Sequence, residues 1–508
     1  MTSVFAGIKN LGNTCYLNVL LQSLSSVPSF HVYLDNLGSQ APQHSLTQVL
    51  NRSIRSLTLG SELLDPTPLT RTQLSSKFPS LREQQDPQEL MHHLFTLIQE
   101  ENAVDTIRKP SYAPSASSSS TSTQKVRNSP FHGEMQSSLK CLGCFDRSAQ
   151  RNVFLDLSLA ISPNAKDNGD RYSRSCELLL ENCMQQFTEK ETLEGVHCNF
   201  CDLHEWMRSN NNKSPLLPIS ATQTFTKTQL EKHRLLYNET KRHQGKTPKR
   251  KTEKQLLLSG LPRALCLHFR RLVAGHSSYG KFTKSNDYVK FPSSLRINKS
   301  WKAKGSCVMP FLSAFSTDMV EQAFSPEMME AAEEASIFNN VNGKEWRYSL
   351  VAVVVHEGNA HGGHYTVYRK LLRRGGFSSE EEYRKFVAAA KRRIEMEETL
   401  LQNALQPQQV RQALERKVRQ EKEEELENGK EPAFQPHPSS PPSDSESPAE
   451  EEEDHQQREA ATSVGAGSSA ATDGQWVYIS DEYCRLVSYE EVSRCKAYML
   501  FYEKDPYS

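Results

Sequence analysis

Cys15 lies where a cysteine can act as a nucleophile. It stands in the segment GIKNLGNTCYLNVLLQSL, whose apolar residues recur with helical spacing: Leu17, Leu20, Leu21 and Leu24. A helix should therefore begin just after the loop that contains glycine and asparagine, with Cys15 at its N-terminus. The free backbone N–H groups and the positive end of the helix dipole favour the thiolate there. Asn10 and Asn13 on the incoming loop are suited to donate an amide N–H to an oxyanion. The alternative is a buried thiol that packs as a small hydrophobic residue.

A hairpin that contains histidine offers the base that such a thiol needs. The segment VAVVVHEGNAHGGHYTVYRK is an apolar strand, a turn with glycines, and an alternating strand that starts at His364. Gly362 and Gly363 come directly before this histidine and permit close approach of a ligand backbone. A histidine at a hairpin end can take the proton of a cysteine if the fold brings the two together. His356 and His361 lie nearby, so a polar hairpin tip with incidental imidazoles is the competing interpretation.

A third polar segment completes an order that is typical of cysteine hydrolases. WVYISDEY places Ser480 and Asp481 at the end of a strand, where either side chain can accept the second N–H of an imidazole. An ordinary strand end has the same appearance, so the segment alone does not indicate catalysis. Because neighbouring side chains of a strand point to opposite faces, we expect Asp481 to point away if Ser480 faces the histidine.

Two C-x-x-C pairs indicate a metal site. Cys141 and Cys144 form the first pair, and Cys198 and Cys201 form the second. Two such pairs, each on a hairpin, can present four thiolates tetrahedrally to Zn²⁺. Their separation of about fifty residues exceeds that of a compact zinc finger, so the metal would tie the ends of a long β-excursion. Reduced free thiols are the alternative, and His197 is a spare ligand that the four cysteines leave unneeded.

The composition excludes several classes of protein. The 508 residues include 61 basic and 61 acidic side chains, so no net charge recruits nucleic acid or an anionic membrane. No apolar run reaches the roughly 18 residues that span a bilayer, and the N-terminus lacks the pattern of a secretory signal. The 11 cysteines fit a reducing compartment better than a disulfide framework. We therefore expect a protein of the cytosolic face, with no spanning membrane segment and no nucleic-acid partner.

Segments that can fold alternate along the chain with segments that cannot. Apolar periodicity predicts helices up to about residue 101, and runs such as NVFLDLSLAI, ALCLHFRRL and YSLVAVVVH predict strands. The serine-rich run after the helices and the acidic, proline-rich tract before the last strands should be disordered. Ser379 and Glu382 favour a capping box at the start of a long charged helix. We interpret this charged region as a solvating spacer and expect the chain to fold without residues 378–470.

Taken together, these segments resemble the conserved boxes of the ubiquitin-specific proteases. The resemblance covers GIKNLGNTCYLNVLLQSL, QQDPQEL, the paired C-x-x-C motifs, LPRALCLHFRRL, HEGNAHGGHYTVY and AYMLFYE, in the family's order from residue 7 to residue 503. It implies an α+β fold of the papain-like cysteine protease type, with a helical thumb, a β-rich palm, and β fingers tied by a structural zinc ion. The catalytic domain at 7–503 would then comprise, in chain order, a thumb at 7–101, a disordered serine-rich insert at 102–130, zinc-binding fingers at 131–214, a palm at 215–370, a charged helical and acidic disordered insert at 371–474, and the C-terminal strands of the palm at 475–503.

The resemblance also assigns roles to individual positions. It implies that Cys15 is the nucleophile, Asn10 the amide of the oxyanion hole, and His364 the general base. Asp86, in QQDPQEL, matches the acidic residue that grips an arginine of the ubiquitin tail, with Gln84 beside it; a solvated helix start is the alternative for Asp86. Further contacts to the Gly-Gly tail of ubiquitin are expected from Gly362, Gly363 and Tyr365. The zinc ligands would be Cys141, Cys144, Cys198 and Cys201.

One departure from the family pattern narrows the resemblance. Ser480 stands where most members carry Asp or Asn, which is similar to a mitochondrial outer-membrane subtype with a Cys-His-Ser triad. That subtype has a membrane-anchoring helix ahead of its Cys box, whereas 14 residues precede Cys15 here. The resemblance thus implies a monomeric deubiquitinase that removes ubiquitin from substrate proteins. Mitochondrial proteins are one expected class of substrate, and membrane attachment stays open. The rival hypothesis is a catalytically silent scaffold that binds ubiquitin, against which the presence of Cys15 and His364 argues.

Overall fold

The computed structural model describes the chain in separate segments. These are residues 5–38, 41–60, 62–77, 83–108, 129–145, 147–161, 178–198, 201, 249–274, 282–303, 346–360, 362–398 and 474–505. The chain divides into two compact units, the first made of Met1–Arg392 and Gly474–Ser508, and the second of Arg393–Asp473. All elements named below lie in the first unit, apart from the last residues of one helix at 380–398. None of the helices in the described segments is long and apolar enough to cross a membrane.

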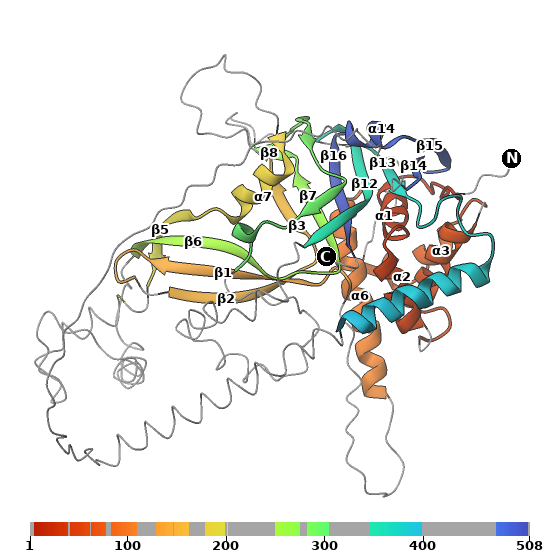
Figure 1. The fold of residues 1–508 in the computed structure, drawn as a ribbon, viewed down its shortest axis with the longest axis horizontal. Coiled ribbons are helices and arrows are strands. Elements are labelled where there is room, and N and C mark those ends of the chain that lie inside the picture. Colours follow the sequence, from red (N-terminus) through yellow and green to blue (C-terminus); the bar gives the residue numbers. More distant parts are fainter. Residues whose placement is uncertain are drawn as a thin grey trace, which may run out of the picture. The chain divides into compact units, whose positions relative to one another are not determined.

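Helix α1 is the central helix of the N-terminal region. It begins at Cys15, as its apolar spacing predicts, and all ten of its residues are buried. Neighbouring helices and strand β13 contact it, which explains why its polar residues are buried too. The helices of this region are α1 (Cys15–Leu24), α2 (Pro28–Gly38), α3 (Leu46–Leu59), α4 (Thr67–Thr70), α5 (Gln73–Lys77) and α6 (Pro87–Arg108) (Figure 1).

An eight-stranded sheet carries the strands that form the candidate site. Its order is β15-β14-β13-β12-β16-β7-β3, and β11 pairs with β12 beside this path. Strand β3 runs parallel to β7, and the other pairs are antiparallel. The strands are β3 (Leu157–Ala160), β7 (Ala264–Arg270), β11 (Ser294–Arg296), β12 (Arg347–Asn359), β13 (Gly362–Lys370), β14 (Trp476–Ser480), β15 (Tyr483–Val487) and β16 (Ala497–Lys504).

Both faces of this sheet are covered, which explains the unbroken apolar run in β12. Val354 belongs to the core that includes helix α1, whereas its neighbours Val353 and Val355 belong to a second core on the other face. Successive side chains of a strand point to opposite faces, so a strand buried on both faces must be apolar at every position. The sheet thus holds the ends of β13 and β14 on a rigid support.

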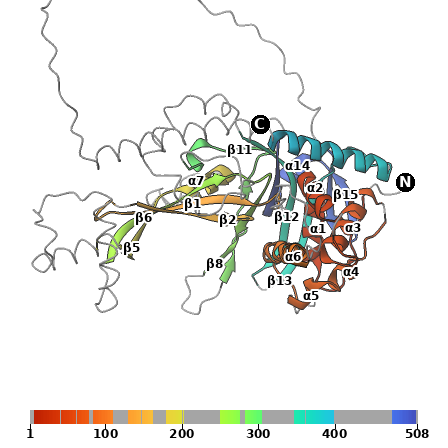
Figure 2. The ribbon, with the colours of Figure 1, turned by 90° about the horizontal axis from the view of Figure 1, so that it is seen from below.

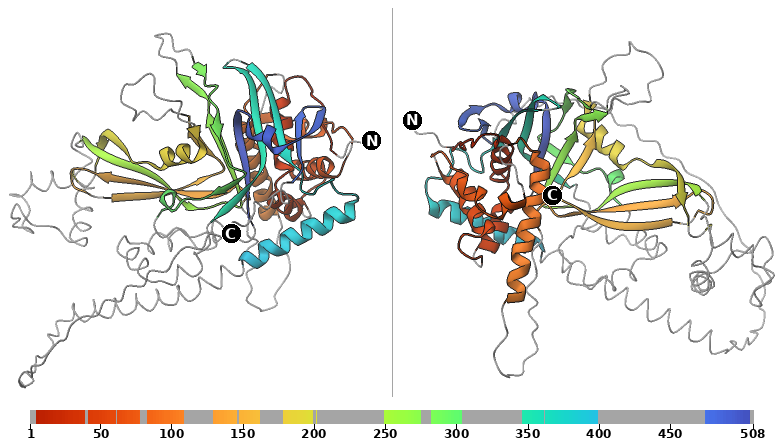
Figure 3. Two further views of the ribbon diagram at one scale, coloured as in Figure 1. Left: turned by 45° about the horizontal axis from the view of Figure 1, so that its top comes forward. Right: turned by 180° about the vertical axis from the view of Figure 1, so that it is seen from behind.

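A separate four-stranded antiparallel sheet, with the order β2-β1-β6-β5, carries the two cysteine pairs. Its strands are β1 (Gly133–Cys141), β2 (Arg147–Phe154), β5 (Glu191–His197) and β6 (Lys249–Gly260). Figures 2 and 3 show this sheet apart from helices α1 to α6 of the same unit. Shorter elements complete the unit: β4 (Leu178–Leu179), α7 (Leu180–Thr188), β8 (Leu272–Ala274), β9 (Phe282–Lys284), β10 (Val289–Lys290), η2 (Lys299–Trp301) and α14 (Tyr489–Ser493).

The helices and strands predicted from the sequence are confirmed where the structure describes the chain. The runs NVFLDLSLAI, ALCLHFRRL and YSLVAVVVH lie on β2 with β3, on β7 and on β12. The serine-rich run, the second half of the charged region and the acidic tract lie outside the described residues.

The helix at residues 380–398 begins where the capping box was predicted. The hydroxyl of Ser379 accepts the backbone N–H of Glu382 at 3.2 Å. The carboxylate of Glu382 accepts from the backbone N–H and the hydroxyl of Ser378, at 2.8 Å each, instead of from the N–H of Ser379. The first half of the predicted box is therefore present, and a neighbouring serine completes the cap.

One face of this helix packs into the first unit, so the interpretation of the whole charged region as a spacer is wrong. Tyr383, Val387 and Ala390 follow one helical face and are each at most 5% exposed. The Tyr383 hydroxyl lies 2.9 Å from Nδ1 of His31, whose Nε2 lies 2.9 Å from the carbonyl oxygen of Ser25. Since a carbonyl can only accept, Nε2 carries the imidazole proton and Tyr383 donates to Nδ1. Burial lowers the pKa of His31 to about 4, which keeps this imidazole neutral.

Removing residues 378–470 should therefore destabilise the first unit instead of leaving it intact. Tyr383→Ala alone should lower the free energy of unfolding by about 3 kcal/mol, because it empties a buried aromatic site. Lys385→Ala, on the exposed side of the same helix, is the matched control and should change it by less than about 0.5 kcal/mol. Chemical denaturation followed by circular dichroism measures both effects. A deletion protein as stable as the full chain would restore the spacer interpretation.

Candidate active site

Cys15 is the first residue of α1, and its side chain is almost completely buried. The residue is 4% exposed, and Thr14 occupies the N-cap without a side-chain capping bond. Burial raises the pKa of the Cys15 thiol, whereas the backbone N–H of Tyr365 and those of Tyr16 and Cys15 itself lower it. The expected effect of the helix N-terminus is therefore present, but burial outweighs it. The pKa of the thiol is therefore raised in this state, and an activated thiolate stays a prediction for the enzyme with substrate bound.

His364 and Ser480 meet at the edge of the eight-stranded sheet. Strands β13 and β14 pair from Val367 with Ile479 to Lys370 with Trp476, so the two polar side chains emerge at the same end. Nε2 of His364 lies 2.8 Å from Oγ of Ser480, a hydrogen-bond distance. The structure thus brings together the imidazole and the hydroxyl that the sequence pairs as base and orienting residue.

The thiol and the imidazole are not hydrogen-bonded in this state. Among the described residues, no hydrogen bond joins Sγ of Cys15 to His364, whereas Nε2 of Gln84 lies 3.9 Å from Sγ. The His364 side chain is 40% exposed and so has room to move. Catalytic hydrogen bonds in free enzymes are often long and tighten only when substrate binds, so this arrangement is compatible with a nucleophile and its base.

Asp481 does not point away from the site, contrary to the expectation from strand alternation. Strand β14 ends at Ser480, and Asp481 turns the chain with a φ of 50°. Its Oδ2 accepts from Nδ2 of Asn10 at 2.7 Å, and its Oδ1 accepts from Nδ2 of Asn18 at 2.7 Å. Oδ2 lies 3.9 Å from Nε2 of His364. Because the left-handed turn breaks the alternation, the carboxylate faces the same site as Ser480.

Both the oxygen and the nitrogen of the Asn10 side-chain amide are hydrogen-bonded. Its Oδ1 accepts the backbone N–H of Gly12 at 2.9 Å and that of Thr14 at 3.3 Å, while Asp481 holds the NH₂ group. A second hydrogen of this NH₂ group remains for a ligand. Asn18 was not among the predicted site residues, although an asparagine inside the apolar run of α1 needs a polar partner when it is buried.

Asp86 lies at a helix start, and it also contacts residues of the candidate site. Its Oδ1 accepts the backbone N–H of Gln88 at 2.8 Å at the start of α6, as a helix cap does. Its Oδ2 accepts the hydroxyl of Tyr498 from β16. Tyr498 packs 5.6 Å from the ring of Tyr365, which stacks on His356 at 4.4 Å. The predicted substrate residue Asp86 is thus anchored by an aromatic group that also contains Tyr365.

The two glycines before His364 serve different purposes. A Cβ added at Gly363 would lie 2.0 Å from the carbonyl oxygen of Glu357 and 2.6 Å from Nε2 of His356. A Cβ at Gly362 would meet only Oε1 of Gln84, at 3.7 Å. Gly363 is therefore required by packing within the hairpin itself, whereas Gly362 borders open space in which a ligand backbone fits.

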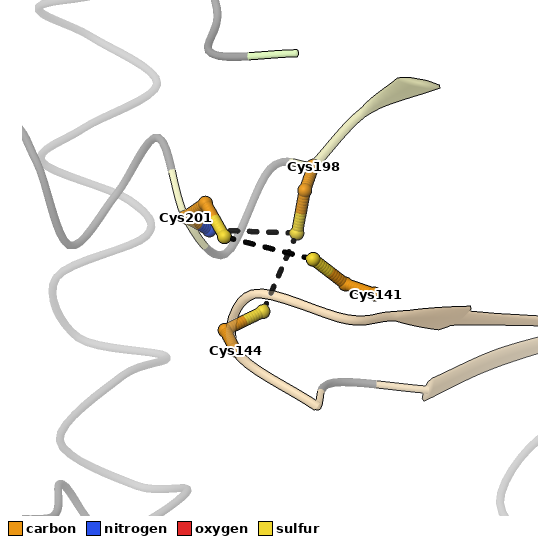
Figure 4. A group of neighbouring side chains, drawn as sticks. All are labelled: Cys141, Cys144, Cys198 and Cys201. Atoms are coloured by element: carbon orange, nitrogen blue, oxygen red, sulfur yellow. Dashed lines mark hydrogen bonds between the residues drawn. The ribbon is translucent and has the colours of Figure 1, made fainter. Parts of the chain in front are cut away.

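The four predicted metal ligands converge at one end of the four-stranded sheet β2-β1-β6-β5 (Figure 4). Cys141 ends β1, and Cys198 follows β5, each with its partner cysteine just beyond. Their ligand atoms all lie within 4.8 Å of one another, and His197 is not part of the group. The pairs Cys144–Cys198 and Cys141–Cys201 have sulfur separations of 3.5 and 3.7 Å. Tetrahedral Zn–S bonds of about 2.3 Å place sulfurs about 3.8 Å apart, so these residues fit a zinc ion.

The sequence of this chain is similar to one protein family over most of its length. Residues 6–414 match the family model described as ubiquitin carboxyl-terminal hydrolase. Ubiquitin carboxyl-terminal hydrolase 30 of Xenopus tropicalis is 26% identical over 423 residues, which cover 72% of this chain and 72% of that protein. The hydrolase 30 of Homo sapiens is 26% identical over 429 residues, covering 72% and 75%. Ubiquitin carboxyl-terminal hydrolase 27 of Arabidopsis thaliana is 27% identical over 426 residues, covering 74% and 77%.

A solved structure shares the fold. The SAGA Ubp8/Sgf11/Sus1/Sgf73 DUB module bound to ubiquitin aldehyde contains a chain that matches with a TM-score of 0.50 and 17% identity, covering 99% of this chain and 70% of that one. At this identity the likeness concerns the fold alone. It confirms the predicted α+β fold class.

Proposed function

The chain belongs to the ubiquitin carboxyl-terminal hydrolase family and is a cysteine-type deubiquitinase, and we propose that Cys15, His364 and Ser480 hydrolyse the isopeptide bond after the C-terminal glycine of ubiquitin. The observation that carries this proposal is the hydrogen bond of 2.8 Å between His364 and Ser480 at the sheet edge that faces the N-terminus of α1. This geometry is what a general base with its orienting residue requires.

In each half of the proposed reaction, His364 acts first as a base and then as an acid, while Asn10 stabilises the oxyanion. His364 takes the proton of the Cys15 thiol, and the sulfur attacks the carbonyl carbon of the terminal glycine. The NH₂ group of Asn10 and nearby backbone N–H groups stabilise the oxyanion that forms. His364 then protonates the leaving lysine amine as the C–N bond breaks. Water attacks the thioester, gives a proton to His364, and releases ubiquitin with a free carboxylate, while the thiol regains its proton.

Recognition of ubiquitin is proposed to use Asp86 and the glycine-lined hairpin. The carboxylate of Asp86, fixed by Tyr498 and the N–H of Gln88, is suited to pair with an arginine of the ubiquitin tail. Gly362 leaves room for a tail without side chains. Ubiquitin and ubiquitinated proteins are thus the partners of this site.

Incubation with a ubiquitin probe that carries a C-terminal electrophile tests the enzymatic function against the scaffold hypothesis. An active enzyme should form a covalent adduct, which mass spectrometry should locate at Cys15. A silent scaffold would retain the probe without a covalent bond, and that result would reject the proposed catalysis.

We also propose that the four clustered cysteines hold a structural zinc ion. Cys141→Ser or Cys198→Ser should lose about one equivalent of zinc and lower the thermal stability of the protein, because such a site forms together with the local fold. Cys495→Ser, which lies outside the cluster, is the matched control and should keep the metal. Elemental analysis that finds no zinc in the unmodified protein would contradict this proposal.

The cellular address is proposed on sequence likeness to the hydrolase 30 proteins alone. We propose the mitochondrial outer membrane, with mitochondrial proteins as substrates, because the Cys-His-Ser site resembles that of the mitochondrial outer-membrane subtype. Fluorescence imaging of the full chain with a mitochondrial marker tests this address, and uniform cytosolic signal would reject it.

A further inference from the structure

Gln84 occupies the strand edge that leads to Cys15. Its Nε2 donates to the carbonyl oxygen of Gly363 at 2.6 Å, and the N–H of Gly363 donates to its Oε1 at 2.8 Å. A carboxamide carries the same donor and acceptor as a peptide group. By bonding to both groups of one residue it reproduces one rung of an antiparallel ladder. The side chain of Gln84 therefore stands where a neighbouring strand would pair.

Within the described segments, no other strand covers this edge of β13 at Gly363, and the edge continues to Cys15. Strand β12 lies opposite Gly363 and Tyr365 on one side, and β14 joins the other side only from Val367 onward. Alternate residues of a strand direct their backbone groups to the same edge, so Gly363 and Tyr365 face the same way. The Tyr365 N–H faces Sγ of Cys15. An extended peptide paired with Gly363 would therefore reach Cys15 two residues further along.

We propose that Gln84 is a specificity-determining plug, which the extended Gly-Gly tail of ubiquitin must displace from Gly363 to reach Cys15. This inference rests on the proposed function. A peptide that adds to a free strand edge gains main-chain hydrogen bonds whatever its side chains are. Only a ligand that supplies both a donor and an acceptor at this rung replaces both bonds of Gln84.

Once displaced from Gly363, the Gln84 amide can donate a hydrogen bond to the oxyanion. Its Nε2 already lies 3.9 Å from Sγ of Cys15, so a small rotation brings it within reach of an oxyanion that forms there. Both bonds to Gly363 are exposed to solvent, so their net contribution is small enough to be exchanged for those of a ligand. Gln84 thus opposes tail binding in the free enzyme and assists the reaction once the tail is bound.

Binding of ubiquitin to the Cys15→Ala protein separates these effects from chemistry. Adding Gln84→Ala should tighten the binding of ubiquitin by about tenfold, since no internal group then competes for Gly363. Ubiquitin that lacks its last two glycines should bind both proteins equally. Gln84→Glu, which keeps the acceptor but loses the donor, should fall between the two. Gln85→Ala, a neighbouring glutamine, is the matched control and should leave both affinities unchanged.

Steady-state kinetics on the protein with an intact Cys15 supply a second measurement. Gln84→Ala should lower both KM and kcat, because it removes a competitor of the tail and a donor to the transition state. Weaker binding by the Gln84→Ala protein, or an equal change for full-length and truncated ubiquitin, would overturn the plug while leaving the proposed function intact. Absence of any ubiquitin binding by the Cys15→Ala protein would overturn both.

Discussion

Replacing Cys15 with alanine should abolish hydrolysis of a fluorogenic ubiquitin conjugate, a loss on the order of a millionfold or to the uncatalysed rate. Among the described cysteines, Cys15 is the one at the N-terminus of α1, the helix that contacts strand β13 of the His364 hairpin. Ubiquitin binding should persist, since one small buried side chain contributes little to an extended recognition surface. His364→Ala should be nearly as damaging to kcat.

The matched control for this substitution is Cys495→Ala, which removes a thiol outside the candidate site and should leave kcat unchanged. Isothermal titration with ubiquitin measures the retained affinity of the Cys15→Ala protein. Hydrolysis at an undiminished rate by that protein would eliminate Cys15 as the nucleophile, and with it the proposed mechanism.

The environment of Cys15 implies that substrate binding completes the site. Burial raises the pKa of the thiol, and no hydrogen bond to His364 exists among the described residues to activate it. Nε2 of Gln84 lies 3.9 Å from the sulfur instead, and the same side chain is hydrogen-bonded to Gly363 of the hairpin. Displacement of Gln84 by the ubiquitin tail would free the strand edge beside Cys15, so substrate binding and completion of the site would occur together.

Local patterns predicted the elements and the residue types of the site. The spacing of apolar residues placed Cys15 at a helix start, and strand alternation placed His364 and Ser480 at strand ends. The C-x-x-C spacing predicted two pairs of ligands. In each case the chemistry depends on residues that are close in sequence, so the signal lies within a short segment.

Contacts between distant segments could not be predicted in this way. Asn10 and Asp481 are 471 residues apart, and only the fold brings them together. The left-handed turn at Asp481 could not be predicted, because the residue with the positive φ is not a glycine. Tyr383, Val387 and Ala390 did form an apolar stripe, but the surrounding charges concealed it, and its partner His31 lies at a separation of 352 residues from Tyr383.

Ser480→Ala should lower kcat by roughly ten- to a thousandfold, less than the loss of about ten-thousandfold for an orienting carboxylate. Its hydroxyl lies 2.8 Å from Nε2 of His364 and is placed to hold the imidazole in one orientation, but a neutral group stabilises the imidazolium less than a carboxylate does. The sequence alone led us to expect a smaller cost for Asp481→Ala. The structure changes that expectation, because Asp481 holds the amide of Asn10, and the loss of one oxyanion donor costs on the order of a hundred- to a thousandfold.

The two effects can be similar in size, so a double-mutant cycle must separate them. If Asp481 acts through the oxyanion amide, Asp481→Ala should cost little more in a protein that already carries Asn10→Ala, whereas Ser480→Ala and Asn10→Ala should add. Steady-state kcat values of the single and double variants, with circular dichroism to confirm folding, give both coupling energies. If instead Asp481→Ala and Asn10→Ala add, while Asp481→Ala costs nothing further in a His364→Ala protein, the carboxylate 3.9 Å from Nε2 orients the imidazole. The triad would then be Cys15, His364 and Asp481.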